Sequence, residues 1–384
     1  MSEKKIVFIN QASGYLTIDI INAFVKTNEF EQVALISGII REQDIAIDSS
    51  VRWSKINLYD RRSAARKFFT WLTATFRIYF LLLTKYRKFE IFYITIPPFA
   101  YLLSLVLPNR FSVLIFDVYP DVLSIYGVKE TNFLYRRWVK WNNLLFSKAY
   151  RIYTIAEGMK CLVAQYVNAE RIHVIHNWSG LTNLVEEDKQ KNPFIKENEL
   201  EGKFIVQYSG NIGYTHNTEI LLDIANVLVA EKDLVFVIIG RGEKFYSLQE
   251  RIKDEKLQNC LILPFQPDHL INYSLGSADL GVVILDEKTA HVSIPSKIYN
   301  LQAVGVPLLC IASLDSEIAR HVDKYQNGKC FTMDSVSEIA SWIIEMKNNS
   351  GALEVIAKNS KNASKEFTIR NADNYAKKYI TGEV

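Results

Sequence analysis

The sequence of 384 residues has little cysteine, proline and glycine, and each shortage excludes a class of protein. Its 4 Cys are far apart and form no Cys-x-x-Cys pair, so a disulfide scaffold, a thiolate metal site and a redox motif are not expected. With 9 Pro and 16 Gly it is not a linker-rich protein. Hydrophobic residues make up 49% of the chain, which is enough for a large core and excludes disorder. At about 150 residues per domain, the length predicts two domains, or three.

No signal peptide is expected at the N-terminus, because its charges are followed by only a short apolar run and then by polar residues. One long stretch without charge, residues 91–109, contains the pair Pro97-Pro98 and then Pro108. A Pro-Pro pair breaks a helix, so a buried strand and a short helix are expected there. The alternative is a membrane-spanning helix.

Acidic residues are scarce in the first half of the chain. Through Gln190 there are 24 Lys and Arg against 17 Asp and Glu, which gives +7, whereas the remainder has 21 against 25, which gives −4. The partner of the first half is therefore expected to be anionic.

Short β-rich apolar runs alternate with amphipathic runs along the whole chain. Strands are predicted at Lys5–Ile9, Gln32–Ser37, Val51–Leu58, Ile91–Ile96, Ser112–Phe116, Arg151–Ile155, His173–His176, Phe204–Ser209, Leu234–Ile239, Cys260–Leu263, Leu280–Ile284 and Pro307–Ile311. Helices are predicted at Ile18–Thr27, Ala64–Lys85, Thr131–Ser147, Gly158–Tyr166, Thr218–Ala230, Lys244–Asp254, Pro267–Leu275, Ser296–Val304 and Ser337–Asn348. This alternation predicts an α/β fold with parallel sheets covered by helices on both faces.

A polar, charge-rich segment interrupts the alternation at residues 184–202 and is interpreted as a linker. Because the βα pattern then restarts, two similar doubly wound, Rossmann-like domains are expected. The predicted division is a first domain at 1–183, the linker at 184–202, a second domain at 203–365 and a C-terminal helix within 366–384.

Two loops of the second half follow strands and carry glycine. In the first, Gly210, Asn211 and Gly213 lie between an apolar strand and a helix, where backbone N–H groups could approach a phosphate. The second has Arg241 between two glycines, with Lys244 close by. Tight turns without a ligand remain the alternative for each loop.

A third loop places Ser296 and Lys297 in the first turn of a predicted helix. A lysine at a helix N-terminus is unfavourable with the helix dipole, which makes sense if the site holds an anion. The alternative is a surface lysine. Because three such loops end strands of one sheet, a site for a phosphate-bearing donor is favoured.

The order of these motifs, SGNIG, IIGRGE, LPFQP, SADLGVVIL and IPSKIYNLQAVGVPLL, resembles retaining GT-B-fold glycosyltransferases of family 4, in the branch that builds bacterial surface polysaccharides such as capsule and O-antigen. In the first half, FDVYPDVL and HNW resemble two further motifs of that branch. The resemblance implies two facing Rossmann-like domains with a nucleotide-sugar, of UDP type, in the cleft between them. It also implies that the helix Asp373–Ile380 returns to the first domain.

The resemblance further implies that the Gly210–Gly213 loop, Arg241 and the Ser296/Lys297 helix start hold the donor diphosphate, and that Phe265 borders the nucleobase. Gly14 and Pro97 would lie in loops on the acceptor side of the first domain.

Four positions depart from the family pattern. Asn211 and His216 stand where the family carries Arg and Lys, and the two acids of a Glu–seven residues–Glu pair fall at Val292 and Asn300. Asn300 could still hydrogen-bond a ribose as an amide. The diphosphate charge would then rest on Lys297, Arg241 and Lys244.

Metal-binding motifs are absent from the sequence. It contains no Asp-x-Asp pair, which agrees with chemistry that needs no metal or other cofactor. His173 and His176, three apart on a predicted strand, are interpreted as structural.

Asp117 and Asp121 follow an apolar strand in the first half. A carboxylate there could orient or deprotonate an acceptor hydroxyl, so both are candidate catalytic residues, with Asp117 preferred. The alternative for Asp121 is that it caps the next helix.

Residues 61–88 contain eight Lys or Arg and no acid, with aromatic residues between them. A basic, aromatic helix suits an anionic membrane surface, and the expected membrane-facing residues are Arg61, Arg62, Arg66, Lys67 and Trp71. A core helix with a solvated basic face is the alternative. Nucleic acid is a third interpretation and is not expected, because no nucleic-acid-binding motif accompanies the patch.

Together these observations predict a cytoplasmic glycosyltransferase, peripheral on the inner face of the cell membrane, that uses a lipid-linked glycan acceptor. A nucleotide-sugar epimerase of the GT-B type and a non-catalytic partner of a polysaccharide synthesis complex are the alternatives.

Overall fold

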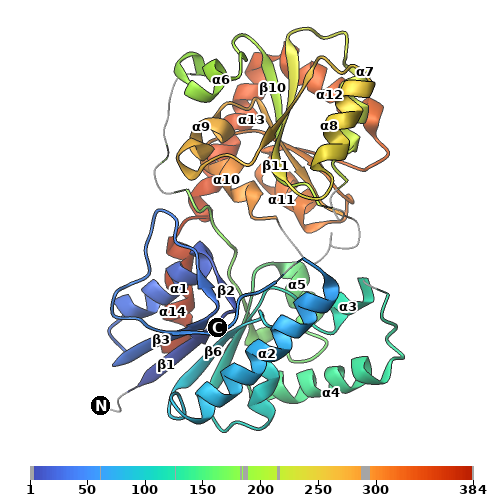
Figure 1. Ribbon diagram of the computed structural model, residues 1–384. Helices are drawn as coiled ribbons and strands as arrows, with labels where there is room; N and C mark the ends of the chain where they lie inside the picture. Colours follow the sequence, from blue (N-terminus) through green and yellow to red (C-terminus); the bar gives the residue numbers. More distant parts are fainter. Residues whose placement is uncertain are drawn as a thin grey trace. The chain divides into compact units, whose positions relative to one another are not determined.

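The computed structural model describes residues 4–60, 62–125, 127–181, 184, 189–213, 217–286 and 295–382 (Figure 1). The chain divides into two compact units. Unit 1 consists of residues 1–180 and 369–384, and unit 2 consists of residues 181–368.

Unit 1 is built on a seven-stranded sheet in the order β5-β3-β1-β6-β7-β8-β9, in which every pairing is parallel. The strands are β1 (Lys5–Ile9), β3 (Gln32–Ser37), β5 (Arg52–Lys55), β6 (Glu90–Ile94), β7 (Phe111–Ile115), β8 (Ile152–Thr154) and β9 (Ile172–Val174). A short parallel pair joins β2 (Ala12–Ser13) to β4 (Ile39–Ile40). The central strands are almost entirely buried, as the continuous apolar runs predict for a parallel sheet covered on both faces.

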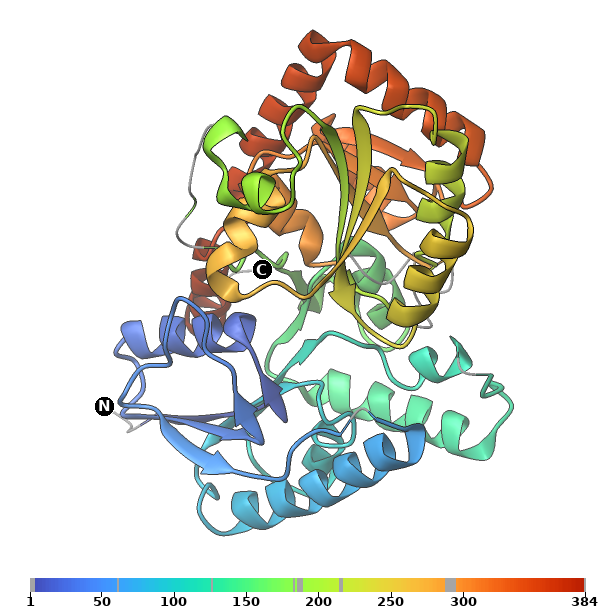
Figure 2. The same ribbon diagram turned by 45° about the horizontal axis from the view of Figure 1, so that its top comes forward.

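Helices cover both faces of this sheet. They are α1 (Tyr15–Lys26), α2 (Ala64–Leu83), α3 (Asp121–Ile125), α4 (Phe133–Lys148), α5 (Glu157–Val163) and α14 (Arg370–Thr381), with 3-10 turns η1 (Tyr101–Leu105) and η2 (Ala169–Arg171). Figures 1 and 2 show α1 and α14 on one face and α2 on the other. The predicted strand and short helix within residues 91–109 are present as the end of β6 and as η1. Among the helices in the described ranges, none is long and apolar enough to cross a membrane.

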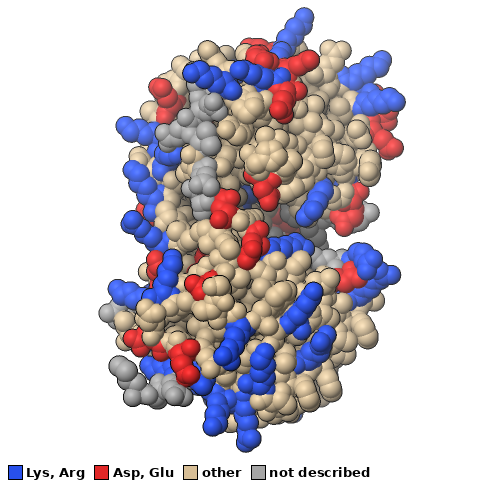
Figure 3. Space-filling view, turned by 60° about the vertical axis from the view of Figure 1, so that its left-hand side comes forward, with Lys and Arg blue, Asp and Glu red and all other residues tan. Residues whose placement is uncertain are grey.

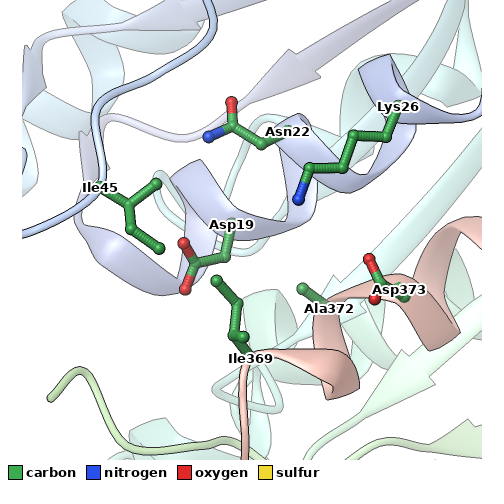
Figure 4. A pocket seen from close by; sticks show the side chains of 7 residues that line it. All are labelled: Asp19, Asn22, Lys26, Ile45, Ile369, Ala372 and Asp373. Atoms are coloured by element: carbon green, nitrogen blue, oxygen red, sulfur yellow. The ribbon is translucent and has the colours of Figure 1, made fainter. Parts of the chain in front are cut away.

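The C-terminal helix α14 packs against α1 inside unit 1. The ring of Tyr379 meets that of Phe24 at 5.2 Å, and Tyr375 donates a hydrogen bond to the carbonyl of Ile175. Where the two helices meet, Figure 4 shows a small pocket lined by Asp19, Asn22, Lys26, Ile45, Ile369, Ala372 and Asp373. Asp19 is buried there and accepts a hydrogen bond from Trp178 Nε1 (2.8 Å). These contacts between α14 and the rest of unit 1 hold the C-terminal segment, residues 369–382, in this unit.

Unit 2 has a six-stranded parallel sheet in the order β12-β11-β10-β13-β14-β15. The strands are β10 (Phe204–Asn211), β11 (Leu234–Arg241), β12 (Cys260–Pro264), β13 (Leu280–Ile284), β14 (Leu308–Ile311) and β15 (Gly328–Phe331). The helices are α6 (Pro193–Glu197), α7 (Ile220–Val227), α8 (Phe245–Asp254), α9 (Ile271–Gly276), α10 (Lys297–Ala303), α11 (Glu317–Tyr325), α12 (Val336–Asn348) and α13 (Ser350–Ala363), with 3-10 turns η3 (Lys189–Lys191), η4 (Asp268–Leu270) and η6 (Ser364–Glu366).

The segment interpreted as a linker, residues 184–202, contains structure of its own. Asn192 accepts a hydrogen bond from Phe194 N (2.9 Å) and begins α6. Phe194 and Ile195 are buried in a cluster with Ile205 of β10. This part of the polar segment is therefore folded into unit 2.

Both sheets reverse their strand order next to the first strand of the unit, between β1 and β6 in unit 1 and between β10 and β13 in unit 2. In open α/β sheets, ligands bind outside the carboxyl ends of the strands at such a reversal. The search for a site therefore begins at the ends of β10 and β1.

Candidate functional site

The carboxyl ends of β10 and β11 come unusually close together. A Cβ on Gly240 would lie 2.0 Å from the carbonyl oxygen of Gly210, and one on Gly242 would lie 2.3 Å from that of Ile212. Only glycine permits this approach. Ile212 N donates to Arg241 O (2.9 Å) and Lys244 N donates to Ile212 O (3.1 Å), so the two predicted loops form one edge.

Lys297, the first residue of α10, places its side chain against this edge. Its Nζ is buried and has no hydrogen-bond partner among the described residues. It lies 2.8 Å from the place that a Cβ on Gly210 would occupy, and 4.0 Å from the ring centroid of Tyr208. Burial lowers the pKa of Lys297 to about 7. A buried amine without an acid or acceptor is a ready site for an anion.

Tyr208 was not among the predicted site residues. Its ring lies under Lys297 Nζ, and its hydroxyl donates to the carbonyl of Asn211 (2.7 Å). Tyr208 and Gly210 point to the same face of β10 because they are two residues apart. That spacing was the one signal in the sequence, and it does not distinguish Tyr208 from an ordinary core tyrosine.

Arg241 and Phe265 form a second pair at the same sheet edge. The guanidinium of Arg241 lies 5.2 Å from the ring centroid of Phe265, which is 49% exposed. In the described part of the chain no acid is paired with Arg241. The pair offers an exposed cation beside an exposed aromatic ring at the ends of β11 and β12.

Lys244 differs from these two cations because an acid holds it. Its Nζ lies 2.7 Å from Glu219 Oε1, so part of its charge is already compensated. Gly213 lies beside this region, close to the side chains of Asn211 and Glu243. Glu219 could not be found from sequence, because acids are common at the start of helices.

The remaining predicted donor residues belong to the region of α10. Ser296 is exposed and precedes the helix without a side-chain capping bond, and Asn300 is half-buried one turn after Lys297. His216 and Val292, two of the departures from the family pattern, lie outside the described residues. The structure thus brings Gly210, Asn211 and Lys297 together, and places Asn300 on the same helix as Lys297.

The two candidate catalytic carboxylates in unit 1 have different surroundings. Asp117 follows β7 and is half-buried, and its backbone N donates to Thr95 Oγ1 (3.4 Å). Asp121 accepts hydrogen bonds from Gln165 Nε2 (2.8 Å) and from the hydroxyl of Tyr166 (2.6 Å). Burial and the hydrogen bond that its hydroxyl donates to Asp121 raise the pKa of Tyr166. Both carboxylate oxygens of Asp121 therefore accept hydrogen bonds that connect α3 to the segment after α5.

Gly14 and Pro97 lie at the ends of neighbouring strands. Gly14 begins α1, with nothing within 4 Å of the place for its Cβ, and Pro97 is buried after β6. Gln11 N donates to Ile96 O (2.7 Å), which joins the two loops. They therefore line the reversal point of the unit 1 sheet.

The histidines and acids that the structure describes form no metal site. Within the described ranges, no group of three or more His, Cys, Asp and Glu side chains could hold a metal ion. His173 is buried on β9, and burial lowers its pKa to about 4. His176 lies beyond the strand, with its Nδ1 3.0 Å from Ile155 O.

The expectation that Trp71 faces a membrane is wrong. It is buried, stacks on Tyr59 at 5.9 Å and meets Phe99 and Tyr119 edge-on, so it belongs to the core face of α2. Arg61 lies outside the described residues.

The expected membrane-facing cations Arg62, Arg66 and Lys67 all have partners in the structure. Arg62 and Arg66 lie 2.7 and 3.9 Å from Asp60, whose pKa the bond from Arg62 lowers to about 2. Lys67 Nζ lies 4.8 Å from the ring centroid of Trp71.

Residues 189–363 match the family model described as glycosyl transferases group 1. The chain is 28% identical over 225 residues to WbjE of Pseudomonas aeruginosa, which is named a probable glycosyltransferase. The matched region covers 58% of this chain and 56% of WbjE. It is 25% identical over 188 residues to WcaI of Escherichia coli strain K12, named for a glycosyl transferase of colanic acid biosynthesis, over 48% of this chain and 46% of WcaI. The chain thus spans about half the length of the curated relatives it matches.

Solved structures resemble the chain over almost its whole length. WaaG, a glycosyltransferase involved in lipopolysaccharide biosynthesis, has a TM-score of 0.69 at 10% identity and covers 98% of this chain and 100% of its own. HepE of Anabaena, in complex with UDP, has a TM-score of 0.70 at 15% identity and covers 99% of this chain and 100% of its own. At such identities the likeness establishes the fold alone, and it agrees with two units that each carry a parallel sheet. The chain has the GT-B fold, and residues 189–363 of unit 2 match the group 1 glycosyl transferases.

Proposed function

We propose that this chain is a retaining glycosyltransferase of family 4. It moves a sugar, of hexosyl or N-acetylhexosaminyl type, from a nucleotide donor to a glycan acceptor linked to polyprenyl diphosphate, in the synthesis of a bacterial surface polysaccharide. The observation that carries the proposal is the buried Nζ of Lys297, which faces Gly210 without a partner among the described residues. It lies in the unit that matches the group 1 glycosyl transferases.

UDP is the proposed nucleotide, and HepE, which shares the fold, binds UDP and UDP-glucose. The donor diphosphate would lie along the joined ends of β10 and β11. Lys297, Arg241 and backbone N–H groups of the Gly210–Gly213 loop would face it, and the ring of Phe265 would border the base.

Cleavage of the bond between sugar and diphosphate leaves negative charge on the departing phosphate oxygen. Fixed cations and N–H groups that already point at this oxygen stabilise the charge without reorganisation. Lys297 is suited to this role because an anion compensates a buried ammonium that otherwise loses its hydration. We expect no metal cofactor, since the sequence has no Asp-x-Asp pair.

The acceptor is assigned to unit 1. Asp117 would orient or deprotonate the acceptor hydroxyl from the end of β7, beside the loops of Gly14 and Pro97. A lipid-linked acceptor also implies that the protein works at the inner face of the cell membrane.

The test combines binding and turnover. Calorimetry should detect binding of UDP to the wild-type chain and a large loss of affinity in Lys297→Met. With a panel of UDP-sugars, release of UDP should require a lipid-linked acceptor. Conversion of the donor without acceptor would instead indicate an epimerase. Absence of nucleotide binding in the wild type would favour a non-catalytic partner of a polysaccharide synthesis complex. The presence of Asn300 where the family carries an acid agrees with that alternative.

A further inference from the structure

Helix α2 exposes a continuous apolar stripe on the side opposite its core face. Phe69, Leu72, Phe76, Phe80 and Leu83 recur every three or four residues and therefore share one face of the helix. They are between 44% and 76% exposed, whereas Trp71, Ala74, Ile78 and Leu82 on the other side are buried. Apolar residues in water on this scale indicate an interaction surface.

Basic residues accompany the stripe. Arg66 and Arg77, both exposed, are eleven residues apart, which is about three turns, so they lie on one side of it. Arg87 and Lys88 follow the helix and are exposed. Helix α2 itself contains no Asp or Glu, and Asp60, which precedes it, pairs with Arg62 and Arg66 at its start.

Helix α4 lies beside α2. The ring of Phe99 meets Phe68 of α2 at 5.7 Å and Trp138 of α4 at 5.4 Å, so the two helices flank one aromatic side chain. Helix α4 also lacks acids and exposes four cations, Arg136, Arg137, Lys140 and Lys148. Phe133 at its start is 75% exposed. In the half of Figure 3 that holds unit 1, Lys and Arg side chains stand on a largely uncharged surface.

We propose that the apolar stripe of α2 inserts into the surface of an anionic lipid bilayer, with the cations of α2 and α4 on the lipid phosphates. A helix with an apolar face and a basic rim lies in the interface and gains affinity from both buried apolar area and anionic lipid. This charge pattern favours lipid over a second copy of the chain, because two copies joined through the stripe would bring their like charges together.

The proposal changes the basis of membrane contact expected from the sequence, since Trp71 is buried and the aromatic anchors are Phe69, Phe76 and Phe80. Lipid binding would bring the proposed transferase to a lipid-linked acceptor. Only this purpose rests on the proposed function. Lipid binding can be measured without any substrate.

The experiment is flotation of the full chain with two kinds of vesicle. One is phosphatidylcholine alone, and the other contains about 30% phosphatidylglycerol to give an anionic surface. The wild type should float with the anionic vesicles, and less so at high salt. Phe76→Ser with Phe80→Ser should lower the bound fraction about tenfold or more, because both rings lose their apolar environment in lipid.

A control removes two exposed apolar side chains from unit 2 instead. Leu314→Ser with Val355→Ser, at 63% and 60% exposure, should float as the wild type does. Unchanged thermal melting and UDP affinity of each variant would show that fold and donor site are intact.

The variant Phe76→Trp gives a second measurement. Because the chain already has 6 Trp, the signal is the difference between the emission of the variant and that of the wild type, which should shift to the blue on anionic vesicles and be quenched by brominated acyl chains. Flotation of the double variant equal to that of the wild type, or dimerisation of the wild type that the double variant abolishes without any lipid binding, would overturn the proposal. Either result would leave UDP binding, and so the proposed donor site, untouched.

Discussion

The Nζ of Lys297 lies 4.0 Å from the ring centroid of Tyr208, so the first residue of α10 reaches over the strand that ends at the glycine loop. The aromatic face gives a cation partial compensation for lost water. Among the described residues no acid completes the pair. Unit 2 therefore keeps a costly buried amine at the reversal point of its sheet.

Replacement of this amine separates stability from binding. Lys297→Met removes the buried polar group, and we expect the free protein to gain about 1–3 kcal/mol in unfolding free energy. UDP affinity should fall about 100-fold, as expected when a charge-assisted bond of about 1.5–3 kcal/mol is lost. Thermal melts without ligand and calorimetry with UDP measure the two effects. A variant that binds UDP as tightly as the wild type would remove Lys297 from the donor site.

The pH dependence of UDP binding follows from the same residue. The pKa of Lys297 is lowered to about 7 in the free protein, and a bound anion should raise it. Below pH 7 the amine is protonated in both the free and the UDP-bound protein, so its titration should not change the UDP affinity there. Above pH 7, binding must take up a proton, so the affinity should fall by up to about tenfold per pH unit.

Calorimetry in buffers of different ionisation enthalpy would detect this proton uptake. Lys297→Arg is the control, since guanidinium stays charged and its binding should not change between pH 7 and 9. Equal pH profiles for wild type and Lys297→Arg would contradict the assignment.

Two neighbouring glycines should respond differently to alanine. At Gly240 a Cβ would meet the backbone oxygen of Gly210, which cannot move alone, so Gly240→Ala should destabilise unit 2 by about 2 kcal/mol or more. At Gly210 the nearest atom is the flexible end of Lys297, but the φ of +157° strains any side chain, so Gly210→Ala should destabilise unit 2 less than Gly240→Ala does and should also weaken UDP binding. Gly276→Ala, with nothing within 4 Å, is the control for both. Denaturant unfolding and calorimetry distinguish the outcomes.

The sheets could be predicted from sequence because parallel strands are buried on both sides and appear as continuous apolar runs. Strand β15 and helix α13, two of the elements that were missed, have weaker patterns. Strand β15 has four residues, of which Phe331 alone is fully buried. Helix α13 begins Ser-Gly and contains several Asn and Ser, which favour turns, yet Asn349 caps its start by accepting from Ala352 N.

The candidate site could be proposed from sequence where the local chemistry was unusual. A lysine in the first turn of a helix and glycines at strand ends both pointed to Gly210 and Lys297. The buried face of α2 was not predictable, because aromatic residues lie on both its sides and Trp71 and Phe76 look alike in sequence. Pairing of Lys244 with Glu219 likewise depends on how α7 and the β11–α8 loop meet.

That ion pair predicts an order among the cations of the donor site. Arg241 is exposed beside Phe265, whereas Lys244 is already held by Glu219. Arg241→Ala should therefore weaken UDP binding by about tenfold or more, and Lys244→Ala by less, because Glu219 already compensates part of the charge of Lys244. Calorimetry of both variants gives the comparison. A larger loss for Lys244→Ala would mean that the lysine leaves Glu219 when the nucleotide binds.

The last prediction separates the two carboxylates of unit 1. Asp117→Ala should leave UDP affinity unchanged and lower transfer to the acceptor about 100-fold or more, the usual contribution of a general base or orienting carboxylate. Asp121→Asn should act mainly on stability, because it weakens the bonds from Gln165 and Tyr166, at a cost of about 1–3 kcal/mol. Transfer rates measured per folded molecule, with melting curves for both variants, test the division. Normal turnover in Asp117→Ala would rule out its acceptor role, and a lost rate with normal melting in Asp121→Asn would move that role to Asp121.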